Sequence, residues 1–154
     1  MIPDLIKAMR AVIAKHDWQC ISVGPCEGDG GDTFAYTVGL KHSFDHPELI
    51  MFGLAPRLMH GIFTDCVEII RESGSLPVDE PIPDILGSGY TVVLKTTDPQ
   101  KFSEYFAMAV NFYGGLSFPA LVLFWPDKDH QFPWNSSEPM GQDAALALIR
   151  RSAH

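Results

Sequence analysis

Residues 34–40 read Phe-Ala-Tyr-Thr-Val-Gly-Leu, which predicts a strand that ends at a glycine. Aromatic and β-branched side chains favour extended structure, and Gly39 permits a close backbone approach that a side chain would prevent. Because successive side chains of a strand point to opposite faces, Tyr36 and Thr37 point in opposite directions. Two interpretations stay open for these two hydroxyls: they orient a ligand, or they pack within the sheet.

Further strands are predicted on both sides of this stretch. Residues 18–23 favour β structure and, across a glycine-rich acidic loop, predict a hairpin with residues 33–40. Residues 49–54 form a short apolar run that suits a third, buried strand, and residues 89–97 alternate as a fourth. The most continuously apolar stretch, residues 119–125, predicts a central strand that is covered on both faces.

Helices are predicted between and around these strands. Apolar residues recur with helical spacing near the start of the chain and again over residues 56–73, where Gly74 stands at the position of a left-handed C-terminal cap. Asp98-Pro99 predicts the start of a third helix that runs to about Asn111, and residues 142–151 predict a short terminal helix. The order predicts an α+β fold in one domain, residues 1–154, with a mixed, largely antiparallel sheet of about five strands and three to four helices.

Composition limits the function classes. A chain of 154 residues with 46% hydrophobic content suits one buried core, and no apolar run is long enough to cross a bilayer. The formal charge of -8 disfavours binding to nucleic acid. Without a secretion signal we expect a soluble, cytoplasmic protein. Of the three cysteines, Cys66 is expected in the core and Cys26 in a reactive loop, while Cys20 carries no nucleophile signature.

Four motifs occur in a characteristic order: Ala-Tyr-Thr-x-Gly-Leu at 35–40, His-Pro-Glu-Leu at 46–49, Trp-Pro-Asp at 125–127 and Phe-Pro-Trp at 132–134. Together with a Gly-Leu pair at a strand end, they resemble the bacterial domain of unknown function family 4262. The resemblance covers roughly residues 18–134. It implies membership of an uncharacterised bacterial family and supplies neither a reaction nor a cofactor, so the cofactor stays unknown.

His42, His46 and Glu48 have a spacing that a loop can wrap around a metal ion. The family motif contains His46 and Glu48 but not His42, so the resemblance does not support a metal site, and we predict none. His46 precedes a proline, which favours an extended backbone, and Glu48 is equally able to stabilise a turn by accepting hydrogen bonds from backbone amides.

The second pair of motifs places polar and aromatic groups after the central strand. Asp127 follows Trp125 at the strand end, a position from which carboxylates meet ligands, although an aspartate there also forms turns. Phe132-Pro133-Trp134 predicts a rigid aromatic elbow that can stack a planar ligand or contact a peptide.

These observations predict a binding module for a small molecule or a protein. The expected ligand-binding residues are Tyr36, Thr37, His46, Glu48, Trp125, Asp127 and Trp134. The chain is also similar, over short stretches, to suppressor-of-fused-like domains among bacterial immunity proteins, which implies a protein partner. The alternative is a small enzyme that uses His46, Glu48 and Asp127 as acid, base or metal-binding groups. A third interpretation is that the motifs serve packing alone.

Overall fold

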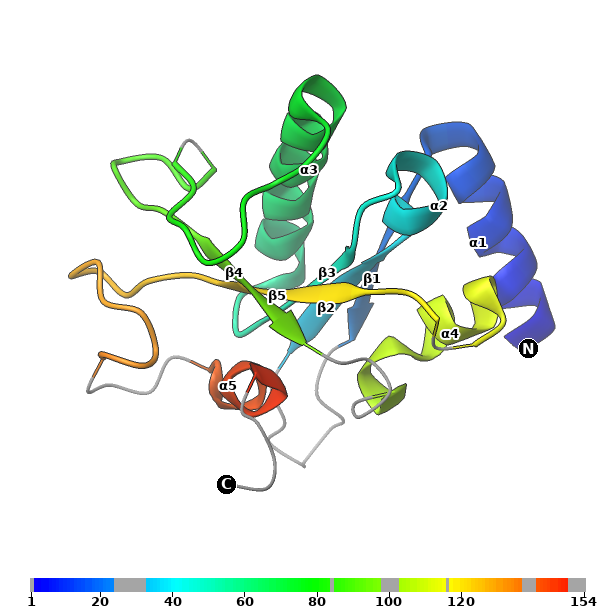
Figure 1. Cartoon of the computed structure of the whole chain (residues 1–154). Helices are drawn as coiled ribbons and strands as arrows, with labels where there is room; N and C mark the ends of the chain where they lie inside the picture. The colour runs from blue at the N-terminus through cyan, green and yellow to red at the C-terminus, as the bar shows by residue number, and fades with distance from the viewer. Residues whose placement is uncertain are drawn as a thin grey trace.

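One mixed sheet organises the part of the chain that the computed structural model describes, which is residues 2–23, 33–83, 85–97, 103–115, 117–136 and 141–149. Its strand order is β1-β2-β3-β5-β4 (Figure 1). The strands are β1 (Gln19–Val23), β2 (Phe34–Val38), β3 (Glu48–Phe52), β4 (Val93–Thr97) and β5 (Ala120–Phe124). The pairing of β3 with β5 is parallel and the other three pairings are antiparallel.

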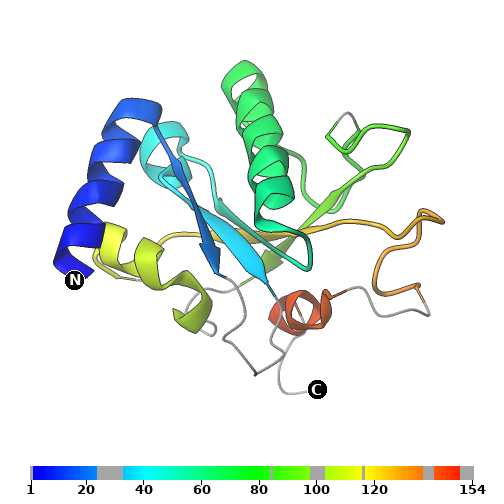
Figure 2. The same cartoon turned by 180° about the vertical axis from the view of Figure 1, so that it is seen from behind.

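Helices cover both faces of this sheet. They are α1 (Ile2–His16), α2 (Leu40–Phe44), α3 (Pro56–Ser73), the 3-10 turn η1 (Ser103–Phe106), α4 (Ala107–Tyr113) and α5 (Asp143–Ile149). Figures 1 and 2 show α3 on one face and α1, α4 and α5 on the other. The predicted α+β fold with a mixed, largely antiparallel sheet of five strands is therefore confirmed.

Strand alternation produces two apolar cores. On the α3 face, Ala35, Leu49 and Leu121 pack against Met59, Phe63 and other residues of α3. On the opposite face, residues of the same three strands pack against α1, α4 and α5; the strand residues there are Tyr36, Val38, Ile50, Phe52, Ala120, Val122 and Phe124. All five residues of β3 and all five of β5 are buried, as expected for strands covered on both sides.

The helix α3 matches its prediction in detail. Its apolar face buries Met59, Phe63 and Cys66, so the core position expected for Cys66 is confirmed. Gly74 ends the helix in the left-handed region, at φ 91°, and its N–H donates to the carbonyl of Ile70. This is the C-terminal cap that the sequence predicts.

The structure differs from the sequence analysis after β2. The predicted strand ran to Leu40, whereas β2 ends at Val38 and Leu40 begins the short helix α2. The third predicted helix is split into η1 and α4, and it ends at Tyr113 rather than near Asn111. Three expected features lie outside the described residues: the start of that helix at Asp98-Pro99, the acidic hairpin loop with Cys26, and the end of the terminal helix at residues 150–151.

Candidate functional site

The Tyr-Thr-x-Gly-Leu motif and the His-Pro-Glu-Leu motif meet at one buried carboxylate. Glu48, at the start of β3, has no exposed surface, and neither has Thr37 of β2. The Thr37 hydroxyl donates to Oε1 of Glu48 at 2.7 Å, and the amide of Gly39 donates to Oε2 at 2.9 Å. The amide of Leu40 donates to Oε1 at 3.2 Å. Three positions of the first motif therefore bind one position of the second.

Two further donors complete the shell of Glu48. The amide of Lys41 donates to Oε2 at 3.4 Å, and the hydroxyl of Tyr113, at the end of α4, donates to the same oxygen. Burial raises the pKa of Glu48, and the donated hydrogen bonds oppose this, those of Tyr113 and Thr37 most strongly. Burial, together with the neighbouring carboxylate, raises the pKa of Tyr113, so its hydroxyl keeps the proton that it donates.

The backbone conformation of Gly39 allows the chain to turn so that these amides reach Glu48. Gly39 has φ 114°, where other residues are strained, and a Cβ atom there would lie 2.7 Å from the carbonyl oxygen of Asp17. The reversal directs the amides of residues 39–41 toward Glu48 and starts α2. The close approach expected at Gly39 is thus made by the protein's own backbone.

His46, two residues before Glu48, is also buried but has hydrogen-bond partners of its own. Its side chain is 3% exposed. The amide of Leu76 donates to Nε2 at 3.2 Å, so the proton of the neutral ring lies on Nδ1, which is 2.9 Å from the carbonyl oxygen of Pro47. Burial lowers the pKa of His46, which favours this neutral form. Within the described residues, no three side chains from His, Cys, Asp and Glu are grouped closely enough to hold a metal ion.

Tyr36 points to the opposite face of the sheet from Thr37, as strand alternation predicts. Its hydroxyl accepts a hydrogen bond from the amide of Met108 at 2.8 Å, and its ring packs edge-on against Phe106. Burial raises the pKa of Tyr36 to about 12. Tyr36 therefore joins β2 to η1 and α4.

Trp125 ties the end of β5 to its neighbours. Its indole Nε1 donates to the carbonyl oxygen of Phe52 at 2.7 Å. The side-chain amide of Gln142 accepts from the backbone N–H of Trp125 at 3.2 Å and donates to its carbonyl oxygen at 2.9 Å. Gln142 is 1% exposed. Its side chain therefore satisfies, at a buried position, the two backbone groups of Trp125 that a neighbouring strand would otherwise bind.

Asp127 shapes the loop that follows. Its Oδ1 accepts from the amides of Asp129 at 2.8 Å and Gln131 at 2.9 Å, and its Oδ2 accepts from the hydroxyl of Ser136 at 2.8 Å. The hydrogen bonds from Gln131 and Ser136 lower the pKa of Asp127. This matches the turn-forming behaviour that the sequence analysis gave as the alternative.

Trp134 is the most exposed aromatic residue of the expected set, at 42%. Its ring stacks on Phe132, with centroids 5.2 Å apart, and Lys95 Nζ lies 5.2 Å from its centroid.

The structure thus brings Thr37 and Glu48 together and places Tyr36, His46, Trp125, Asp127 and Trp134 in separate environments. Their use as ligand contacts stays a prediction. Tyr113 was missed, because its Tyr-Gly-Gly sequence indicates only a helix end.

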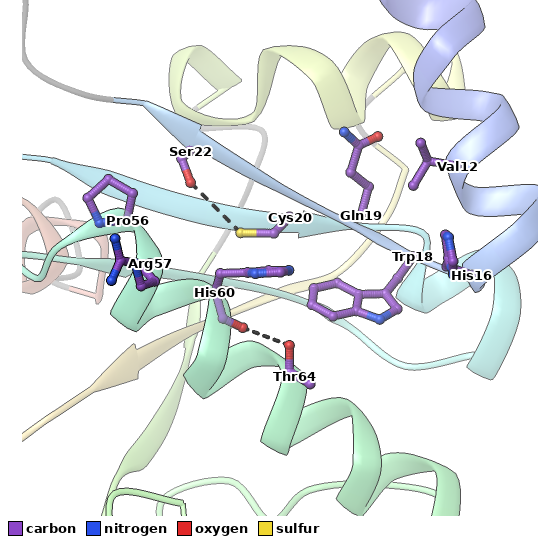
Figure 3. A pocket seen from close by; sticks show the side chains of 10 residues that line it. All are labelled: Val12, His16, Trp18, Gln19, Cys20, Ser22, Pro56, Arg57, His60 and Thr64. Atoms are coloured by element: carbon purple, nitrogen blue, oxygen red, sulfur yellow. Dashed lines mark hydrogen bonds between the residues drawn. The ribbon is translucent and has the colours of Figure 1, made fainter.

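A second candidate region lies at the open edge of the sheet, beside β1. An open hollow of about 680 Å³ lies along β1 between α1 and α3, and we call it the edge groove. Figure 3 shows its lining side chains, among them Trp18, Gln19 and Cys20 near or on β1 and Arg57 and His60 on α3. The rings of Trp18 and His60 are tilted neighbours, with centroids 5.9 Å apart.

The edge groove combines apolar side chains, those of Val12, Trp18 and Pro56, with polar ones. None of the described residues that line it is Asp or Glu, although the chain has a net charge of -8. The side-chain oxygen of Gln19 is buried and accepts no hydrogen bond from the described residues. Burial raises the pKa of the Cys20 thiol, and Ser22 Oγ lies 4.0 Å from its sulfur. The thiol is therefore not activated as a nucleophile.

Comparisons with known proteins place the sequence motifs in context. The model of one family, described as Domain of unknown function (DUF4262), matches residues 12–138. No curated protein and no solved structure matches the chain. None of the helices in the described residues is both long and apolar enough to cross a membrane.

Proposed function

The chain belongs to the DUF4262 family, whose function is unknown, and we propose from its structure that it is a binding module that takes an anionic ligand in the edge groove. The observation that carries this proposal is the Arg57 guanidinium in a groove whose described lining contains no Asp or Glu, in a protein with a net charge of -8. Arg57 always carries its charge, and the imidazole of His60 adds a hydrogen-bonding group on the same helix. A carboxylate on the ligand would form charge-assisted hydrogen bonds there.

The lining also suits a ligand with a planar or apolar part. Trp18 offers an aromatic surface beside the His60 ring. The buried side-chain oxygen of Gln19 accepts no hydrogen bond from the described residues. It favours a ligand that brings an N–H donor, because a buried acceptor without a partner costs free energy. The ligand therefore combines a negative charge with an amide-like donor.

In this proposal the first two family motifs position one wall of the groove. A Cβ atom on Gly39 would lie 3.0 Å from Cα of Trp18, so the turn that binds Glu48 packs directly against the residue that precedes β1. Ser43 of α2 adds a hydrogen bond at 2.6 Å to the carbonyl of Asp17. Gly39 of the first motif and Ser43 of α2 thus fix the backbone next to Trp18.

An enzymatic role for Glu48, His46 and Asp127 ranks second. Glu48 is fully buried and accepts five hydrogen bonds, so a substrate would have to displace part of this shell to reach it. Both ring nitrogens of His46 have backbone partners, and Asp127 binds its own loop. The binding role requires no such rearrangement.

Calorimetric titration of the purified protein with N-acetylglutamate amide, citrate and phosphate tests the proposal. Arg57→Gln is expected to weaken binding by about tenfold or more, the loss typical of one charge-assisted hydrogen bond. Arg10→Gln is the matched control, because Arg10 lies over Phe112, away from the groove. The proposal fails if the wild type binds none of these probes, or if Arg57→Gln and Arg10→Gln bind them equally.

A further inference from the structure

The two edges of the sheet differ in how they are covered. Beyond β4, the amide of Asp79 donates to the carbonyl of Leu94 at 2.8 Å, and Ile82 exchanges two hydrogen bonds with Val92 at 2.8 and 3.1 Å. Residues 79–82 therefore protect that edge. At the other edge, β1 pairs only with β2 within the described residues. Proteins usually cover such an edge, since its free backbone groups can pair with another chain.

The strand register identifies the free backbone groups of β1. The amide of Gly53 donates to the carbonyl of Thr33 at 2.9 Å, in register with the pairing of β2 and β3. Residues of an antiparallel strand bond alternately to one neighbour and the other, so Phe34, Tyr36 and Val38 turn their backbone groups to β1. Their partners there are Val23, Ile21 and Gln19. The N–H and C=O groups of Cys20 and Ser22 consequently point to the open edge.

We propose that the edge groove binds an extended acidic segment of a partner protein, which adds to β1 as a sixth strand through the backbone groups of Cys20 and Ser22. This inference rests on the proposed function and specifies its ligand as a peptide. Strand addition supplies affinity through main-chain hydrogen bonds and specificity through alternate side chains. A peptide also brings N–H donors, and the buried oxygen of Gln19 has none among the described residues.

Charge complementarity identifies the occupant. The side chains of Cys20 and Ser22 lie on the α3 face, because their strand partners are Thr37 and Ala35, and Ala35 packs in the core cluster under α3. Every second side chain of the added strand would extend toward this face, where Arg57 and His60 line the groove. Acidic side chains at alternate positions meet that lining. Pairing of β1 with a second copy of itself would instead bring the Arg57 guanidinium groups of the two copies to the same face.

A capped eight-residue peptide of alternating Thr and Glu is the probe, compared with N-acetylglutamate amide as the single-residue ligand. Wild type is expected to bind the peptide at least about tenfold more tightly, which corresponds to the main-chain bonds of a short added strand. Ser22→Pro removes a donor on the open edge, where proline is tolerated, and should return the affinity to the single-residue value.

A second measurement keeps the test independent of the folding of Ser22→Pro. Two copies of the peptide, N-methylated at the Glu or at the Thr amides, are titrated into the wild-type protein. One of them should lose the peptide advantage and the other should keep it, because only alternate amides of a strand face β1. Equal binding of both methylated copies, or a peptide that binds no better than N-acetylglutamate amide, overturns the added strand and leaves the proposed function standing. Absence of all binding overturns both.

Discussion

Tyr113 donates its phenolic proton to the buried carboxylate of Glu48 and thereby joins the end of α4 to the start of β3. The same hydroxyl accepts a hydrogen bond from the amide of His42 at 3.3 Å, so it also contacts α2. The hydroxyl of Tyr113 therefore joins α4 to two elements that lie far from it in the sequence, α2 and β3. The bond closes the shell of donors that Thr37 and the amides of residues 39–41 begin.

Tyr113→Phe should destabilise the protein by about 1–3 kcal/mol, because it leaves the buried side chain of Glu48 one donor short. The free energy of unfolding in urea measures this. Tyr90→Phe is the matched control: its hydroxyl donates to the carbonyl of Lys128 at an exposed site, and its loss should cost less than about 0.5 kcal/mol. Equal losses for the two variants would show that the bond to Glu48 contributes nothing beyond a surface contact.

Local patterns were sufficient to predict the strands and α3 but not α2. The apolar periodicity of residues 56–73 and the cap at Gly74 are properties of neighbouring residues, and both were found. The helix α2 has five residues, too few for a periodic pattern. Its first amides are satisfied by Glu48, seven to nine positions further along the chain, so its start depends on tertiary structure.

The candidate site was only partly predictable for the same reason. The sequence analysis named Thr37 and Glu48 among its expected site residues but did not predict the hydrogen bond between them. Strand alternation separated Tyr36 from Thr37 correctly. Tyr113 lies 65 residues from Glu48, and no local pattern reports such a contact. The edge groove depends on the adjacency of β1 and α3 across the sheet, which the sequence alone does not define.

Glu48→Gln should cost about 2–4 kcal/mol at neutral pH, because its amide group faces backbone N–H donors. The exposed Glu72→Gln is the control, with a change within about 0.5 kcal/mol. Burial raises the pKa of Glu48 above its ordinary value of 4.5, so this group stabilises the fold most below pH 4.5 and less as pH rises through the folded-state value.

Urea unfolding at several pH values between 4.5 and 8 checks the sign of this effect. The free energy of unfolding of the wild type should fall more steeply with rising pH than that of Glu48→Gln. The opposite difference in slope would mean that the five donors lower the pKa of Glu48 by more than burial raises it.

His46→Ala should remove a contribution to the free energy of unfolding that increases with pH, whereas the contribution of Glu48 decreases with pH. Burial lowers the pKa of His46 below 6.5, so its contribution is complete above pH 6.5 and is lost as pH falls through the folded-state value. The variant should be less stable at pH 7.5, by about 1–3 kcal/mol, since the amide of Leu76 loses its acceptor. Its deficit should shrink at pH 5.5 in the same urea assay; a deficit that grows would contradict the neutral buried ring.

Asp127→Asn should lower the melting temperature slightly, because asparagine keeps one oxygen for the amides of Asp129 and Gln131 but loses the charge that favours these bonds. Asp129→Asn is the control, since the Asp129 side chain is exposed. Binding of N-acetylglutamate amide should be unchanged in both variants. A specific loss of binding in Asp127→Asn would instead support the ligand contact that the sequence analysis expected.

Gly39→Ala should be the most damaging small substitution in the motifs. Its φ of 114° strains any residue with a Cβ atom, and that atom would lie 2.7 Å from the carbonyl oxygen of Asp17, which is backbone and cannot move aside easily.

Gly74→Ala is its matched control, with φ 91° but no atom within 4 Å of the added Cβ. We expect a loss of about 1 kcal/mol for Gly74→Ala, from the backbone strain alone, and about 3 kcal/mol or more for Gly39→Ala. Urea unfolding measures both. Because the turn at Gly39 packs against Trp18, any folded Gly39→Ala protein should also bind N-acetylglutamate amide more weakly, whereas Gly74→Ala should bind it as the wild type does. Equal losses of stability would show that the backbone at Asp17 moves aside for the added Cβ atom. The turn at Gly39 would then not determine the position of Trp18 in the groove.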